Sequence, residues 1–231
     1  MNRLIINKYE VAIFPKDFYV SDLNSLMQEF KKIDVFANGV NTIIPLPPNA
    51  PREIPRLLLS SKDKLIGCNV TFDKINVYWL NSNEKANFSK PVAEITSLIN
   101  TISQTIFSHT GTRRAKRIGF IKEYYIETDE PVGIVKGKTV SDTIASDLKD
   151  FILQLTFKLE NLSSYSNCNE VVILNSGGMK QTEKKKVLML THDINTIQTE
   201  EVNWDSQQIS QFITEAYSKS DKKSLKERFF V

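Results

Sequence analysis

Short runs of alternating apolar and polar residues, joined by very short turns, constrain the fold of this chain more than any other feature. The clearest run covers residues 151 to 160, where Phe and Leu residues occupy every second position. Residues 57–61, 65–72 and 75–80 form further runs, separated only by two turns of three and two residues. A period of two is typical of β-strands with one buried face, and turns of this length join antiparallel neighbours. The sequence therefore predicts an antiparallel sheet.

Apolar residues at helical spacing predict a long helix over about residues 89 to 108 and a final helix that begins near residue 205. The buried faces of these helices would be formed by Val92, Ile95, Ile99, Ile102 and Ile106, and by Ile209, Phe212, Ile213, Ala216 and Tyr217. A shorter helix is expected after Ser21 as its N-cap, and the proline-rich residues 34 to 55 are expected to form an extended connection. Helices combined with strand meanders indicate the α+β class, with helices on one face of an antiparallel sheet.

The two halves of the chain show the same predicted order of strand, helix, three strands and helix. A strand at residues 5–14 opens the first half. The elements of the second half before the final helix are predicted at residues 116–127, 141–149, 151–160, 170–175 and 185–192. We therefore divide the chain into residues 1–112 and 113–231, two β-α-β-β-β-α halves of one compact domain. The residues themselves do not repeat, so duplication is a hypothesis based on the pattern alone.

The alternation also predicts which side chains are buried. In the first strand Ile5, Tyr9, Val11 and Ile13 should lie on one side, with Lys8 and Glu10 on the other. In the strand that contains Arg117, Ile118 and Phe120, the two apolar side chains should point inward and the arginine should lie on the opposite face. The core is expected to include Ile95, Ile99, Ile102, Phe151, Leu153, Leu155 and Phe157. If Leu155 is well packed, its truncation to Ala should lower the free energy of unfolding by roughly 2–5 kcal/mol.

No combination of residues indicates a catalytic, metal or cofactor site. His109 and His192 have no third metal-binding residue near them in sequence, and Cys68 lies within a predicted strand. The Gly177-Gly178 pair joins two predicted strands, so it is expected in a hairpin and not in a phosphate-binding loop. We therefore expect a protein that is not an enzyme and that has no cofactor.

Basic residues gather in three groups, although the net charge is only +3. The groups expected to contact a partner or nucleic acid are Arg113, Arg114, Lys116 and Arg117, and Lys180, Lys184, Lys185 and Lys186. The third group consists of Lys219, Lys222, Lys223, Lys226 and Arg228. Cations gathered on one face would neutralise phosphates, and Tyr124 and Tyr125 could stack on single-stranded bases. Alternatively, these cations belong to solvated loops and helix ends, and they protect sheet edges from aggregation.

The composition favours a cytoplasmic location. The two cysteines, Cys68 and Cys168, suit free thiols in a reducing compartment better than a disulfide scaffold. No apolar run approaches the ~20 residues that span a bilayer. The N-terminal sequence MNRLIINKYEVAIF interrupts its apolar residues with charged ones, which is typical of a strand and not of a signal peptide.

Several local strings resemble a sporadically distributed family of uncharacterised prokaryotic proteins. PPNAPREIPRLLLSSKDK is followed by INVYWL, a predicted helix and then RIGFIKEYYIE. Within this last string Arg117, Gly119, Tyr124 and Ile126 match a strand of the type R-h-G-h-R-Y-h-N-R-I, where h is apolar, but its asparagine and second arginine are absent. Ile213-Thr214 matches the family's closing helix. The resemblance implies no activity, and the family's patchy distribution is typical of mobile or antiviral defence loci.

These observations lead to three hypotheses. The first is a non-catalytic accessory protein that binds a protein partner through the edges of a broad sheet, with an effector nuclease of a prokaryotic defence system as the candidate partner. The second is direct binding of nucleic acid by the basic groups. The third is a cryptic metal-dependent nuclease, which would use Glu170 together with Glu183 and Lys185.

Overall fold

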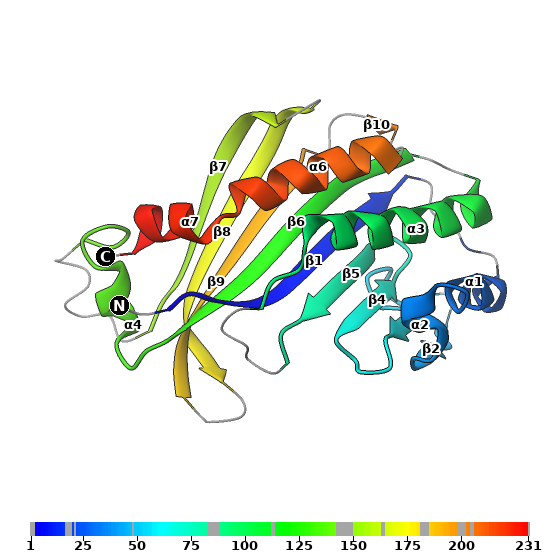
Figure 1. The fold of residues 1–231 in the computed structure, drawn as a ribbon, viewed down its shortest axis with the longest axis horizontal. Coiled ribbons are helices and arrows are strands. Elements are labelled where there is room, and N and C mark those ends of the chain that lie inside the picture. Colours follow the sequence, from blue (N-terminus) through cyan, green and yellow to red (C-terminus); the bar gives the residue numbers. More distant parts are fainter. Residues whose placement is uncertain are drawn as a thin grey trace.

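We analysed a computed structural model of the chain. It describes residues 3–16, 20, 22–47, 49–82, 88–111, 114–141, 150–162, 165–180, 185–197, 202–203 and 206–230. The predicted strand–helix order is recognisable in it, and the two expected long helices lie across a broad twisted sheet (Figure 1).

Nine strands form an open antiparallel sheet in the order β2-β3-β4-β5-β1-β6-β9-β8-β7, and the short β10 pairs with β6. The strands are β1 (Ile5–Pro15), β2 (Asn41–Ile43), β3 (Leu57–Ser60), β4 (Ile66–Val70), β5 (Ile75–Leu80), β6 (Arg114–Glu127), β7 (Ile152–Leu162), β8 (Tyr165–Lys180), β9 (Lys185–Thr196) and β10 (Val202–Asn203). The predicted α+β class with an antiparallel sheet is confirmed.

The helices of the described chain pack on the same side of the sheet. They are α1 (Leu23–Phe30), α2 (Asp34–Ala37), α3 (Val92–Thr110), α4 (Pro131–Val135), α6 (Ser206–Lys219) and α7 (Lys222–Phe229). Each contributes a fully buried side chain to one core, namely Leu26, Phe36, Ile95, Val135, Ile209 and Leu225. The helices α3 and α6 lie side by side (Figure 1), and the Asn100 side chain donates to the Ser210 hydroxyl at 2.8 Å between them.

Apart from the short edge strand β2, the strand order reads the same from both ends toward the centre. The first half contributes β3-β4-β5-β1 and the second contributes β7-β8-β9-β6, so the opening strands of the halves, β1 and β6, pair at the middle of the sheet. Their ladder runs from Ile5 opposite Tyr125 to Pro15 opposite Ala115. The repeated order predicted from the sequence is therefore a repeated spatial arrangement.

Most of the predicted buried positions are correct. Ile95, Ile99 and Ile102 are fully buried, as are the side chains of Ile118 and Phe120 on β6. The predicted inner face of α6 is also confirmed, with Ile209, Phe212, Ile213 and Ala216 fully buried and Tyr217 partly buried.

Ile5 lies on the opposite side of β1 from the one that the alternation predicts. A register shift between Ile6 and Lys8 inserts an extra residue into the strand, and such a bulge reverses the alternation on one side of it. Ile6 therefore joins the main core, whereas Ile5 packs with Tyr125 and Val187 in a small separate cluster. Tyr9, Val11 and Ile13 do face the core, as expected.

Two further local expectations differ from the structure, and a third is not tested by the described residues. The N-cap of α1 is Asp22, whose carboxylate accepts from the Ser25 N–H at 3.0 Å, and the predicted cap Ser21 lies outside the described residues. The extended connection over residues 34–55 contains the short elements α2 and β2. The helix predicted at 141–149 falls almost wholly outside the described residues, and the short α4 precedes it.

The strand predicted at residues 151 to 160 exists, but it is less buried than expected. It is β7, at the end of the sheet order. Phe151, Leu153 and Leu155 pack against the core while remaining partly accessible, and Phe157 is 36% exposed. Its apolar side faces the core as predicted, but an edge strand has a neighbour on one side only, so its side chains are covered less completely.

Candidate functional site

The first predicted basic group is only partly described. Arg113 lies outside the described residues, and Arg114 is described for its backbone alone, at the start of β6. Lys116 is exposed. Arg117 is partly buried, and its guanidinium lies 3.7 Å from the Asp193 carboxylate and 5.3 Å from the centre of the Phe14 ring. Arg117 therefore contributes to packing on the face of the sheet opposite the helices.

The second predicted basic group lies at the far end of the same strands. Lys184 is outside the described residues, and the backbones of Lys180 and Lys185 pair between β8 and β9. Lys186 is exposed, and its carbonyl accepts from the Thr128 N–H just beyond the end of β6.

The structure does not bring Lys116 and Lys186 together. Position 128, which meets Lys186, is twelve residues further along the chain than Lys116. At about 3.3 Å per strand residue, the two lysines are on the order of 40 Å apart. The exposed cations of the two groups therefore do not form one compact patch.

Glu170 is part of a buried polar cluster with His192 and Arg228. Its carboxylate accepts from Arg228 Nη1 at 2.6 Å and Nη2 at 3.0 Å, and it lies 2.8 Å from Nε2 of His192. Burial opposes its ionisation, but the hydrogen bonds and charges of His192 and Arg228 outweigh burial and lower the pKa of Glu170 to about 2. This cluster fastens α7 to β8 and β9.

Of the other two residues of the nuclease hypothesis, the structure describes only the backbone of Lys185, which lies far from Glu170. Glu183 is outside the described residues, and Lys185 pairs with Lys180, ten residues along β8 from Glu170. That separation is on the order of 30 Å. Among the described residues no group of three or more His, Cys, Asp and Glu side chains could hold a metal ion. His109 lies in the last turn of α3 and faces α1, with Nδ1 3.1 Å from the Thr105 carbonyl and Nε2 3.4 Å from the Ser25 hydroxyl.

The two edges of the sheet differ in how far they are protected. The strand β2 has only three residues and leads into a proline-rich segment, and short strands and prolines are the usual protection of an edge. The other edge, β7, has eleven residues with the sequence ILQLTFKLENL, which contains no Pro or Gly and one Lys. Within the described chain β7 pairs with β8 alone, and Ile152 is 74% exposed. Among the residues that the structure places, β7 is therefore an open edge with apolar side chains.

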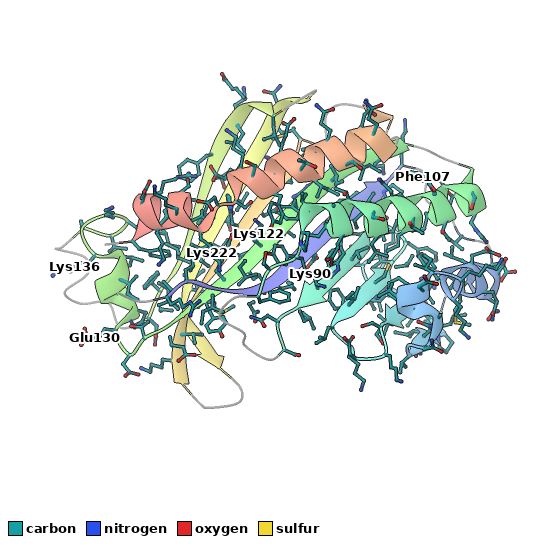
Figure 2. All side chains as sticks on the ribbon, viewed as in Figure 1. Lys90, Phe107, Lys122, Glu130, Lys136 and Lys222 are labelled. Atoms are coloured by element: carbon teal, nitrogen blue, oxygen red, sulfur yellow. The ribbon has the colours of Figure 1, made fainter. Side chains whose placement is uncertain are left out.

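A second candidate site is an open pocket of about 1220 Å³ where α6 meets α7 above β1 and β6. Figure 2 shows Lys122 and Lys222 close together at this corner, with Lys90 just before α3. Pockets that bind small molecules measure about 300–1,000 Å³, so this one can accept a small organic ligand. Its apolar wall is formed by Leu4, Ile6, Tyr9, Phe88, Val92, Tyr124 and Tyr217.

Lys122 lies in the wall of this pocket and is 4% exposed. Its amine donates to the carbonyls of Tyr217 at 3.0 Å and Ser220 at 3.2 Å, and it lies 3.7 Å from the centre of the Tyr217 ring. The Tyr124 hydroxyl donates to the same Ser220 carbonyl at 2.6 Å. Burial lowers the pKa of Lys122 to about 7, an effect that Asp221 opposes and Lys222 increases. Lys122 and Tyr124 thus fasten the α6–α7 corner to β6.

The rim of the pocket is basic. Its cationic lining residues besides Lys122 are Arg3, Lys222, Lys223 and Lys226, and its acidic ones are Asp221 and Glu227. Burial, followed by the charges of Arg3 and Lys226, lowers the pKa of Lys222, while Asp221 opposes the shift. The cations are therefore close enough to repel one another, and the Asp221 carboxylate is also engaged as the N-cap of α7.

Tyr9 closes the floor of the pocket with a polar atom that lacks a partner. Its hydroxyl is buried and makes no hydrogen bond within the described part of the chain. Burial, followed by the nearby Tyr217, raises the pKa of Tyr9; Ser89 and Lys90 are also near, but none of these groups has hydrogen-bond geometry to the hydroxyl. The rings of Tyr9 and Tyr217 are stacked with their centroids 6.0 Å apart.

The pocket could have been found partly from the sequence. Ile118 and Phe120 were predicted to point inward, and the same alternation places Lys122 and Tyr124 on that side of β6. The third basic group contributes Lys222, Lys223 and Lys226 to the rim, whereas Arg228 binds Glu170. Their convergence with Arg3 and Tyr9 depends on chain packing, which no local pattern shows.

Comparisons with known proteins do not assign this chain. No family model, curated protein or solved structure matches it. Among the described residues, no helix is long and apolar enough to cross a membrane.

Proposed function

We propose that the protein is a non-catalytic interaction protein that binds a protein partner by adding a strand of that partner to β7. The open edge of β7 supports this proposal, because such an edge presents backbone N–H and C=O groups that another chain can pair with. A sheet that protects β2 and leaves β7 open has one edge suited to pairing.

The side chains of β7 supply specificity to such a partner. Phe157 lies on the helix side of the sheet, where its ring is 6.4 Å from that of Phe229, and Ile152 lies on the opposite face. A partner strand would therefore meet an apolar group on each face, while its backbone supplies the hydrogen bonds. The family resemblance directs the search for this partner to effector nucleases of prokaryotic defence systems.

The partner should be lost when charges are added to β7. Ile152 and Thr156 are both exposed on β7, so the double variant Ile152→Lys/Thr156→Lys leaves the core intact while it makes pairing unfavourable. A tagged copy of this variant, expressed in the native host, should recover at least about tenfold less partner than the unmodified protein, because tenfold corresponds to only about 1.4 kcal/mol of binding free energy.

Val40→Lys is the matched control, because Val40 is another exposed apolar residue, 61% accessible, and lies beside β2 instead of β7. The control should recover the partner fully. Equal recovery by both variants would place the partner elsewhere and refute the proposal. Incubation of the purified protein with labelled DNA and RNA plus magnesium or manganese tests the two alternatives, since binding without cleavage would favour the second hypothesis and cleavage the third.

A further inference from the structure

The pocket at the α6–α7 corner combines two chemical environments that suit different parts of one ligand. Its rim has more cationic than acidic residues, and its floor is built from aromatic and aliphatic side chains with several hydroxyl groups. A ligand that matches both parts carries an anionic group on a ring-shaped or apolar body.

The cationic part is arranged for a group with more than one negative charge. Lys222 and Lys226 come from α7 and Arg3 comes from the segment before β1, so the positive charge is held by two separate pieces of the chain. Burial is the main cause of the lowered pKa of Lys222, and repulsion by Arg3 and Lys226 adds to it. An anion between these cations would relieve that repulsion. Phosphate suits this position because it accepts several charge-assisted hydrogen bonds at once.

The floor favours a ring with polar atoms over a plain hydrocarbon chain. The buried Tyr9 hydroxyl has no hydrogen-bond partner among the described residues, and a buried polar group without a partner is costly. Ser89, Thr214 and Ser218 add further hydroxyl-bearing side chains to the wall. A fatty acyl chain would leave the Tyr9 hydroxyl without a partner, whereas a nucleobase offers donors and acceptors.

We propose that this pocket binds a phosphorylated ring compound of the mononucleotide class, with the phosphate at Arg3, Lys222 and Lys226 and the ring over Tyr9 and Tyr217. This site is separate from the β7 edge, and the inference does not depend on the proposed protein partner.

Calorimetric titration of the whole protein with AMP, GMP, CMP and UMP tests the proposal. At least one of these should bind saturably, and its uncharged nucleoside should bind at least about tenfold more weakly, because it lacks the charge-assisted contacts. Inorganic phosphate and laurate are the comparison ligands. Binding of none of the four nucleotides would overturn the proposal. So would phosphate competing as well as the best nucleotide, or laurate binding more tightly than it.

Two variants separate the parts of the site. Lys222→Gln/Lys226→Gln should weaken nucleotide binding by about tenfold or more. The control Lys32→Gln/Lys62→Gln removes the same charge from exposed positions outside the pocket and should bind normally. Tyr9→Phe should retain its melting temperature, because the hydroxyl makes no hydrogen bond to any residue that the structure describes. The variant should weaken binding of the nucleotide but not of phosphate.

Failure of the nucleotide proposal can also be told apart from failure of the proposed protein partner at β7. Ile152→Lys/Thr156→Lys changes the β7 edge alone, so it should bind the nucleotide with unchanged affinity. If Lys222→Gln/Lys226→Gln and its control bind equally, the rim does not hold the phosphate and the proposed site is wrong.

Discussion

At the scale of single residues, Lys122 shows that a core can hold an amine at the cost of the hydration of its ammonium form. Its amine is held by two backbone carbonyls and by the Tyr217 ring, yet the pKa falls from its ordinary value of 10.5 to about 7, chiefly because of burial. The hydrogen bonds fix the α6–α7 corner, but they do not compensate fully for the lost hydration of the ammonium group. The folded protein therefore releases this proton more readily than the unfolded chain does.

This difference predicts a measurable dependence of stability on pH. Below the folded-state pKa of about 7, Lys122 is protonated in both the folded and the unfolded chain. It therefore does not make the free energy of unfolding depend on pH in that range. Between about 7 and 10.5 the unfolded chain holds the proton and the folded chain does not. The free energy of unfolding should therefore rise with pH by up to about 1.4 kcal/mol per unit from this group. Lys122→Met removes this contribution.

Urea denaturation of both proteins at about pH 6 and about pH 9 gives the measurement. The stability of the natural protein minus that of Lys122→Met should be larger at the higher pH. Taking this difference cancels the other titrating groups that the two proteins share. A constant difference would mean that the two carbonyls keep Lys122 charged throughout, and the pKa would then not be lowered.

At the scale of elements, β7 and β8 have similar apolar patterns but different positions in the sheet. Leu155 on β7 is only partly buried, whereas Leu174 on the neighbouring β8 is fully buried. Leu174→Ala should cost about 2–5 kcal/mol in the free energy of unfolding, and Leu155→Ala about 1–2 kcal/mol, because less apolar surface is lost to water. Urea denaturation of the two variants tests this prediction: at equal m-values, the midpoint should fall further for Leu174→Ala than for Leu155→Ala. Equal costs would mean that β7 is covered on its open side in solution.

The same comparison shows what the sequence reveals and what it does not. The long helices are predictable because the buried residues of α3, from Ile95 to Ile106, recur with the helical period within one short stretch of sequence. The direction in which β7 faces is predictable for the same reason, but its place at the edge is not, because strand order is set by pairing between distant segments. The bulge near Ile6 has no local signature, so Ile5 is misassigned.

For the candidate sites too, the sequence shows the local pattern but not the contacts between distant segments. Lys122 lies on a face that the alternation of β6 predicts, but its apolar surroundings give no reason to expect a ligand there. The pocket exists only because Tyr9, Lys122 and Lys222, which are far apart in sequence, meet at one corner. The two basic groups that look strongest in the sequence lie at opposite ends of β6, since antiparallel pairing carries the hairpin of β8 and β9 away from the start of that strand.

At the scale of the whole molecule, the central pair of strands joins the two halves into one core. β1 and β6 pair along most of their lengths, and a single buried cluster includes residues from both halves. Each half alone would expose a full central strand edge and the apolar face that the other half covers. The arrangement therefore favours one cooperative unit, although the element order repeats.

Cutting the chain between the halves tests this view. Fragments 1–112 and 113–231 should each fail to give a sharp thermal transition when they are expressed alone, because β1 and β6 would each lose their partner and leave side chains such as Val11 and Phe120 exposed. Co-expressed fragments should assemble into a one-to-one complex, because the ladder between β1 and β6 and the contact between α3 and α6 can form between separate chains. Size-exclusion chromatography and near-ultraviolet circular dichroism follow both outcomes. A fragment that melts cooperatively by itself, with native-like aromatic signals, would show that the halves are independent domains joined by a dispensable interface.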